Sequence, residues 1–319
     1  MRRYLLHIGF FCIWLTPVFP QYLSVDELLN KGSVEISQRR FADAINSFSR
    51  VINMAPSNLQ AYTGRAMACI YSAFYEEAMR DIVKALSIDN NYPEAYYVRG
   101  WLEIYQRQYD RALLDFNTAL DINPSFKPAK AGRIQIYILM NDIVKAQELA
   151  DACIKEDPSY GDYFFYKAKI MNMRQKYQDA IEYFNLALDI STNIDRYEIY
   201  LNRGNVKQTM NLLISAKDDF DKAIGIDSSH ASAFHARAVT FYRLGYYPEA
   251  LKDFNKAIEL IEQSKEKYEN PNEAYYNRGM TYFRLSEYGK ACRNFHTACG
   301  LGNTNACKMV VLNCSAGNP

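Results

Sequence analysis

The stretch Pro93–Phe126, PEAYYVRGWLEIYQRQYDRALLDFNTALDINPSF, determines how the rest of the chain is interpreted. It divides into two short segments with the apolar periodicity of amphipathic helices. Gly100, Ala112 and Ala119 are small where two helices must approach closely, and Phe116 fills the space beside them. Pro124 closes the unit, so the stretch predicts a helical hairpin.

The same pattern recurs in register along nearly the whole chain. The fourth unit is the weakest, because Ile134 stands where a small residue is expected and Ala150 where an aromatic is expected. Insertions at 195–196 and 265–271 interrupt the period. A frame with the length of the first stretch gives eight units, which are 25–58, 59–92, 93–126, 127–160, 161–194, 197–230, 231–264 and 272–305.

This spacing resembles the tetratricopeptide repeat (TPR), whose period is about 34 residues. The resemblance implies an all-α fold: a right-handed α-solenoid of about eight TPR hairpins, with the first helix of each hairpin on the concave face. One hairpin cannot bury its apolar face alone, so neighbouring hairpins must stack. The array would occupy 22–305, and 306–319 would form a short capping helix and tail, with Thr304 as the N-cap of a helix ending at Asn313.

The N-terminus differs from the array. Arg2 and Arg3 precede the uncharged run YLLHIGFFCIWLTPVF, which is the layout of a secretory signal peptide over residues 1–21. We therefore expect an exported protein of bacterial type, located in the periplasm or cell envelope. The run is short against the roughly 20 apolar residues of a spanning helix. An uncleaved N-terminal anchor remains the alternative.

The resemblance also implies which first-helix side chains line the concave groove. They form an aromatic and apolar surface, and such surfaces are usually binding sites in which aromatic anchors dominate. The alternative is that some of these rings pack onto neighbouring helices. The candidate groove residues are Met67, Tyr71, Tyr97, Trp101, Tyr105, Phe165, Met173, Tyr242 and Tyr276.

A basic residue recurs at the seventh position of every unit. It is Arg65, Arg99, Arg133, Arg203, Arg237 or Arg278 in six units and Lys31 or Lys167 in the other two. One interpretation is a basic ladder for carboxylates or phosphates. The interpretation that we favour is structural, with each stem packed between hairpins and each head on a carboxylate.

Four cysteines gather at the C-terminal end. Cys299 and Cys307 are centred on Asn303, and so are Cys292 and Cys314. An antiparallel helical hairpin would bring the members of each pair together, and in an exported protein they would form disulfides that staple the cap. The alternative is buried thiols. The spacing lacks the Cys-x-x-Cys of zinc sites, so we expect no metal.

The sequence carries no catalytic motif that we can identify, and almost no residues remain outside the array. With a net charge of +1 and no basic face, nucleic-acid binding is not expected, nor is a cofactor. The sequence predicts a non-catalytic scaffold that binds a protein or peptide partner in its groove. Two alternatives stay open: a membrane-anchored TPR receptor, and a carbohydrate-binding envelope protein that would add Gln135, Lys169 and Asn172 to the aromatic groove.

Overall fold

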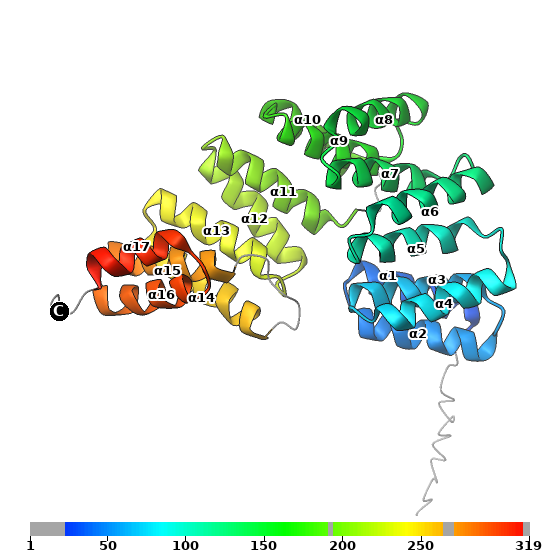
Figure 1. Cartoon of the computed structure of the whole chain (residues 1–319), viewed down its shortest axis with the longest axis horizontal. Coiled ribbons are helices and arrows are strands. Elements are labelled where there is room, and N and C mark those ends of the chain that lie inside the picture. Colours follow the sequence, from blue (N-terminus) through cyan, green and yellow to red (C-terminus); the bar gives the residue numbers. More distant parts are fainter. Residues whose placement is uncertain (1–22, 191–193, 264–270, 315–319) are drawn as a thin grey trace, which may run out of the picture. The chain divides into compact units, whose positions relative to one another are not determined.

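The computed structural model describes residues 23–190, 194–263 and 271–314. Regular structure within these ranges is entirely α-helical (Figure 1). The predicted signal peptide, residues 1–21, lies outside the described residues. The helices are α1 (Val25–Ser37), α2 (Phe41–Met54), α3 (Leu59–Tyr71), α4 (Tyr75–Ile88), α5 (Pro93–Tyr105), α6 (Tyr109–Ile122), α7 (Lys127–Leu139), α8 (Ile143–Glu156), α9 (Gly161–Met173), α10 (Tyr177–Asp189), α11 (Arg196–Thr209), α12 (Leu213–Ile226), α13 (Ala231–Leu244), α14 (Tyr247–Gln263), α15 (Pro271–Arg284), α16 (Tyr288–Gly300) and α17 (Thr304–Asn313).

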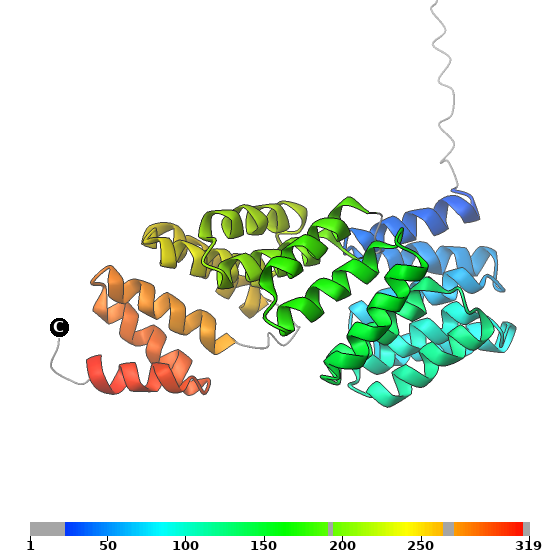
Figure 2. The same ribbon diagram turned by 90° about the horizontal axis from the view of Figure 1, so that it is seen from above.

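The helices pack in sequence order as antiparallel hairpins, from α1 with α2 to α15 with α16 (Figure 2). The second helix of a hairpin also contacts the first helix of the next one, as α6 does with α7 and α8 with α9. The fold is thus an all-α solenoid. The chain forms two compact units that divide after Asn90, one with α1–α4 and the other with α5–α17.

A buried phenylalanine holds successive hairpins together. Phe116 on α6 is fully buried between Gly100 on α5 and Gly132 on α7. A Cβ atom would lie 2.6 Å from the Phe116 ring at Gly100 and 2.8 Å from it at Gly132, so both positions require glycine. This close approach lets one ring fill the space between three helices.

The weak fourth repeat has an exchange of large and small residues. Ile134 replaces the glycine or alanine of the other repeats, and Ala150 replaces the phenylalanine that most of them carry. Both side chains are fully buried in the same core cluster. The volume added on α7 therefore compensates for the volume removed on α8, which explains why a strict frame matches this repeat poorly.

The turn inside each hairpin uses one left-handed residue. The non-glycine residues with positive φ are Arg39, Ala73, Arg107, Asn141, Gln175, Asn211 and Ser286, with φ between 58° and 61°, and Gly245 occupies the same place at 84°. The adjoining amide then bonds back to the end of the first helix, as Gln108 N does to Glu103 O at 2.8 Å. This repeated turn fixes how each pair of helices is joined.

The capping helix α17 packs on α16 and begins one residue earlier than predicted. Its N-cap is Asn303, not Thr304: Asn303 Oδ1 accepts a hydrogen bond from Ala306 N at 2.9 Å. Asn303 is in an extended conformation and its short side chain reaches the free amides of the first turn. Disulfides join Cys292 to Cys314 and Cys299 to Cys307, with Cα–Cα distances of 5.6 and 4.7 Å.

Candidate functional site

Three of the predicted groove residues form an aromatic face on α5. We call Tyr97, Trp101 and Tyr105 the α5 face. The ring of Tyr97 lies 6.3 Å from Trp101, edge to face, and 5.7 Å from Phe126. Tyr97 and Trp101 are half-buried, whereas Tyr105 is 42% exposed. The side chains thus rest on the core while part of their surface stays accessible.

The indole nitrogen of Trp101 is a buried donor without a partner. Among the described residues, no acceptor lies within hydrogen-bond distance of Trp101 Nε1. An unpaired buried donor costs about 1–3 kcal/mol. The face therefore combines accessible ring surface with one unused polar group.

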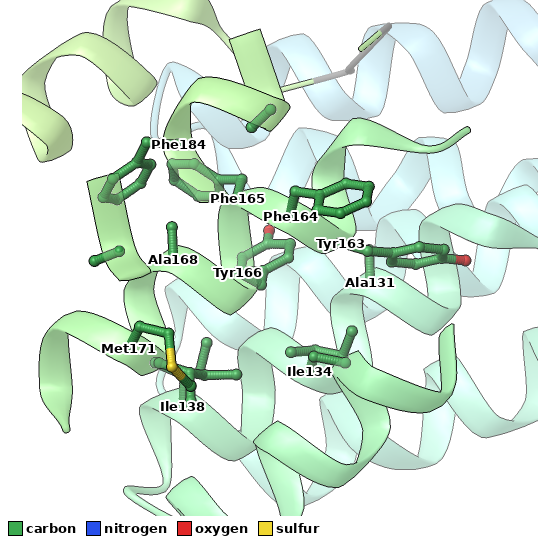
Figure 3. Packing of buried hydrophobic residues seen from close by; sticks show 14 of the residues in the cluster. Ala131, Ile134, Ile138, Tyr163, Phe164, Phe165, Tyr166, Ala168, Met171 and Phe184 are labelled. Carbon is green, nitrogen blue, oxygen red and sulfur yellow. The ribbon is translucent and has the colours of Figure 1, made fainter. Parts of the chain in front are cut away.

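Phe165 does not belong to an open groove, contrary to the prediction. Its side chain is only 4% exposed and lies in the core beside Phe184 and Tyr166, with ring centroids 5.9 and 5.3 Å away (Figure 3). The physical reason is that α9 contacts four helices, α7, α8, α10 and α11. Nearly every side of α9 is therefore covered, including the side predicted to face a partner.

The remaining candidates are spread over the array. Met173 is 44% exposed at the end of α9. Tyr242 is half-buried and its hydroxyl accepts a hydrogen bond from Arg284 Nε at 3.2 Å, and Tyr276 packs 6.0 Å from Phe295. These residues are not gathered around the α5 face.

Met67 and Tyr71 lie on α3, in the separate unit of α1–α4. Both are half-buried, and the Tyr71 ring stacks on Phe41 at 5.0 Å. Tyr71 therefore packs onto the neighbouring helix α2, as the alternative interpretation of the groove residues expected.

The polar residues considered for sugar binding are partly engaged inside the protein. Gln135 Oε1 accepts a hydrogen bond from the Tyr166 hydroxyl at 2.5 Å. The Lys169 ammonium lies 5.5 Å from the centre of the Phe165 ring, and burial lowers the pKa of Lys169. Asn172 is exposed. These groups do not form a ring of free polar contacts beside Trp101.

The recurring arginines are structural in most repeats. Four of the six arginines bond in a two-pronged manner to an aspartate sixteen residues later, on the second helix of the same hairpin. Such bidentate pairs are strong and fix geometry. The pairs are Arg65–Asp81, Arg99–Asp115, Arg203–Asp219 and Arg237–Asp253, and Arg278 bonds Asn294 in the same place.

A polar pocket near the C-terminal cap was not expected from the sequence. It measures about 350 Å³, and its lining includes Asn205, Gln208, His235, Asn277 and Asn303. Burial lowers the pKa of His235 to about 4, so this ring is neutral at pH 7. Its signal in the sequence was the change from apolar to amide residues at first-helix positions after α10. No group of His, Cys, Asp or Glu suited to a metal is found among the described residues.

No helix in the described part of the chain is long and apolar enough to cross a membrane.

This geometry defines a class of protein: a solenoid of helical hairpins whose first helices carry aromatic faces. Sequence profiles of the tetratricopeptide repeat match residues 93–126, 140–193, 197–230 and 231–264. The chain is a tetratricopeptide repeat protein.

Curated relatives match only parts of the chain. A TPR repeat-containing protein of Methanocaldococcus jannaschii is 23% identical over 118 residues, covering 37% of this chain and 20% of the relative. A DnaJ homolog subfamily C member 7 homolog of Schizosaccharomyces pombe is 35% identical over 86 residues, covering 26% and 18%. The mouse protein O-mannosyl-transferase TMTC1 is 22% identical over 149 residues, covering 46% and 16%. The chain thus spans a fifth or less of these relatives.

Solved structures share the fold. Cut9 in the APC/C hetero-tetramer Cut9–Hcn1 superposes with a TM-score of 0.73 at 14% identity, covering 90% of this chain and 55% of that one. Yeast Tom70 gives 0.59 at 15% identity, covering 85% and 66%. A TPR protein from Parabacteroides merdae gives 0.53 at 19% identity, covering 81% and 98%. At these identities the likeness shows the fold alone.

Proposed function

We propose that this protein is a non-catalytic scaffold that binds a segment of a partner protein through the α5 face. The observation that carries the proposal is the accessible aromatic surface of Tyr97, Trp101 and Tyr105 on one helix. Aromatic side chains supply large contact area at low entropic cost and dominate protein interfaces.

We further propose that the scaffold acts outside the cytoplasm, in the periplasm or at the cell envelope. The basis is the signal-like layout of residues 1–21. N-terminal sequencing of the protein purified from its own cells tests this. A mature start near Gln21 supports export, whereas a chain that retains Met1 or Arg2 supports the membrane-anchored alternative.

The sequence offers a direct test of the α5 face. Its two tryptophans are Trp14, in the predicted signal peptide, and Trp101. In the protein without residues 1–21, tryptophan emission, excited where the tyrosines do not absorb, therefore reports on Trp101 alone. Candidate partner segments that bind this face must change the emission of Trp101 saturably. Tyr97→Ala and Tyr105→Ala should weaken that binding at least tenfold at unchanged helicity, while the exposed Tyr246→Ala is the matched control.

A second candidate function is binding of a neutral carbohydrate, and the pocket near the cap is the observation that favours it. Its amides and the neutral His235 ring can exchange hydrogen bonds with hydroxyl groups without presenting a cation. Glycan-array binding that is lost in Asn205→Ala and Gln208→Ala, but retained in Tyr97→Ala, would support this function. Loss in Tyr97→Ala alone would move any sugar site to the α5 face.

A further inference from the structure

Four hairpins of the array pair their arginine with an aspartate, whereas the hairpin of α7 and α8 has an arginine without a partner among the described residues. In the neighbouring hairpin, Arg99 Nε and Nη2 donate to the two carboxylate oxygens of Asp115 at 2.9 and 2.7 Å. In the hairpin of α7 and α8, Arg133 occupies the same place, but sixteen residues later stands Leu149. This hairpin therefore has the arginine but neither the aspartate nor the asparagine that pairs with it in other hairpins.

No other group in the described part of the chain takes the place of that carboxylate. Arg133 forms no hydrogen bond or ion pair there, and its Nε atom is buried without a partner. In later hairpins the arginine also reaches a residue of the preceding hairpin, as Arg237 does to Asp221 at 2.7 Å. The corresponding residue for Arg133 is Asn117, which does not bond to it and carries no charge.

The arginine borders a small pocket with mostly apolar walls. The pocket measures about 270 Å³, and its lining includes Leu120, Pro124, Leu149 and Cys153, with Lys130 and Arg133. Lys130 is already neutralised, because its ammonium bonds Glu156 at 2.6 Å. The pocket therefore holds one uncompensated positive charge beside apolar surface. Arg133 is half-buried with its Nε atom buried, so an anion that pairs with it would offset the partial loss of hydration.

We propose that an acidic side chain of a partner protein, next to an apolar residue in that partner, enters this pocket and completes the pair with Arg133. The carboxylate of the partner protein would accept hydrogen bonds from Arg133, as the Asp115 carboxylate accepts them from Arg99 within this chain. The pocket is smaller than the roughly 300–1,000 Å³ of typical small-molecule sites, which suits a side chain. This inference rests on the proposed scaffold function, but it places the contact away from the α5 face, between α6, α7 and α8.

The test uses two blocked tripeptides, acetyl-leucyl-glutamyl-leucine amide and its glutamine counterpart, with the protein lacking residues 1–21. Saturation-transfer NMR observes the peptide, and the Arg133 Nε–H resonance reports the location. The glutamyl peptide should shift that resonance saturably and bind at least tenfold more tightly than the glutaminyl peptide. Equal binding of the two peptides, no binding, or tighter binding of inorganic phosphate would overturn the proposal.

The array supplies a matched set of variants. Leu149→Asp gives Arg133 the internal partner found in other hairpins, so it should reduce glutamyl-peptide binding at least tenfold while helicity is unchanged. Arg133→Gln should do the same by removing the charge, and Leu149→Met should bind as the unmodified protein does. Undiminished binding in Leu149→Asp would contradict the inference.

A groove variant separates this inference from the proposed function. Tyr97→Ala with Tyr105→Ala should leave binding of the glutamyl peptide unchanged. If the peptide fails to bind while Trp101 still reports a partner segment, the Arg133 site is wrong and the scaffold proposal stands. If the peptide binds while no partner segment changes the emission of Trp101, the Arg133 site stands and the α5 face is not the binding surface.

Discussion

Arg99 on α5 and Asp115 on α6 form a two-pronged ion pair that joins the helices of one hairpin. The hydrogen bonds that Arg99 donates to Asp115 raise the pKa of the Arg99 guanidinium. The carboxylate is nearly buried, while about a third of the Arg99 side chain remains exposed. The same relationship recurs in other hairpins, so it is a structural element of the array rather than a ladder for ligands.

Asp115→Ala should therefore destabilise the protein by leaving Arg99 without its partner. Breaking a fully buried pair costs about 3–5 kcal/mol, and the exposure of Arg99 reduces this to about 2 kcal/mol. Urea unfolding followed by circular dichroism measures the change. The exposed Asp110→Ala on the same helix is the control and should change stability by less than about 0.5 kcal/mol. Equal effects of the two variants would contradict the role assigned to the pair.

Ala73→Gly should stabilise the unit of α1–α4. Ala73 has φ of 59°, and the left-handed conformation costs a non-glycine residue about 1–2 kcal/mol. Part of that gain is offset by the greater freedom of glycine in the unfolded chain, leaving about 0.5–1 kcal/mol. Ala42→Gly, on the exposed side of α2, should act in the opposite direction by a similar amount. Thermal unfolding of both variants measures these changes in stability. A loss of stability in Ala73→Gly would contradict the account.

The cap should depend on its disulfides. The bridges close loops with sequence separations of 22 and 8 residues, and each such bridge stabilises by about 2–4 kcal/mol. Reduction should therefore increase hydrogen exchange in α17 while the α5–α6 hairpin keeps its protection. Intact mass after alkylation, with and without reductant, measures the oxidation state. Four freely alkylated thiols among these cysteines in the protein purified from its own cells would show that the bridges do not form.

Stability should fall between pH 6.5 and 4 because of His235. Burial lowers its pKa to about 4 in the folded protein, below the roughly 6.5 of an unfolded chain. The unfolded state therefore binds more protons in this range, and folding is progressively disfavoured as the pH falls. His235→Gln, which cannot titrate, should show a shallower loss over the same window. Identical pH profiles of both proteins would remove His235 from the explanation.

The repeat period predicted the hairpins well, because the small residues and Phe116 act within and between adjacent helices. Phe165 could not be placed in the same way. Its burial depends on four neighbouring helices, a property of how the hairpins stack rather than of its position in the repeat. The position of a residue in the first helix of a repeat predicts which side of that helix its side chain occupies. The stacking of neighbouring hairpins then determines whether a partner protein can reach that side chain.

The sequence contains the departure at Arg133, but the sequence alone does not indicate that a contact is missing there. Leu149 and Asp115 occupy the same place in their repeats, and the difference becomes informative once Arg99 is seen to bond Asp115. The exchange of Ile134 and Ala150 is similar. Each residue departs from the repeat pattern, and their burial in one core cluster shows that the larger side chain fills the volume left by the smaller one. Comparison of the repeats thus identifies residues that depart from the common pattern, and the side-chain contacts in the structure explain these departures.

The most direct test of the scaffold function is the fluorescence titration of Trp101 in the protein lacking residues 1–21, using segments of proteins that co-purify with it. The account predicts a saturable change in Trp101 emission with at least one protein segment, weakened at least tenfold by Tyr97→Ala with Tyr105→Ala and unaffected by Tyr246→Ala. Partner segments that bind equally well to all of these variants, without a change in Trp101 emission, would contradict the claim that the α5 face is the binding surface.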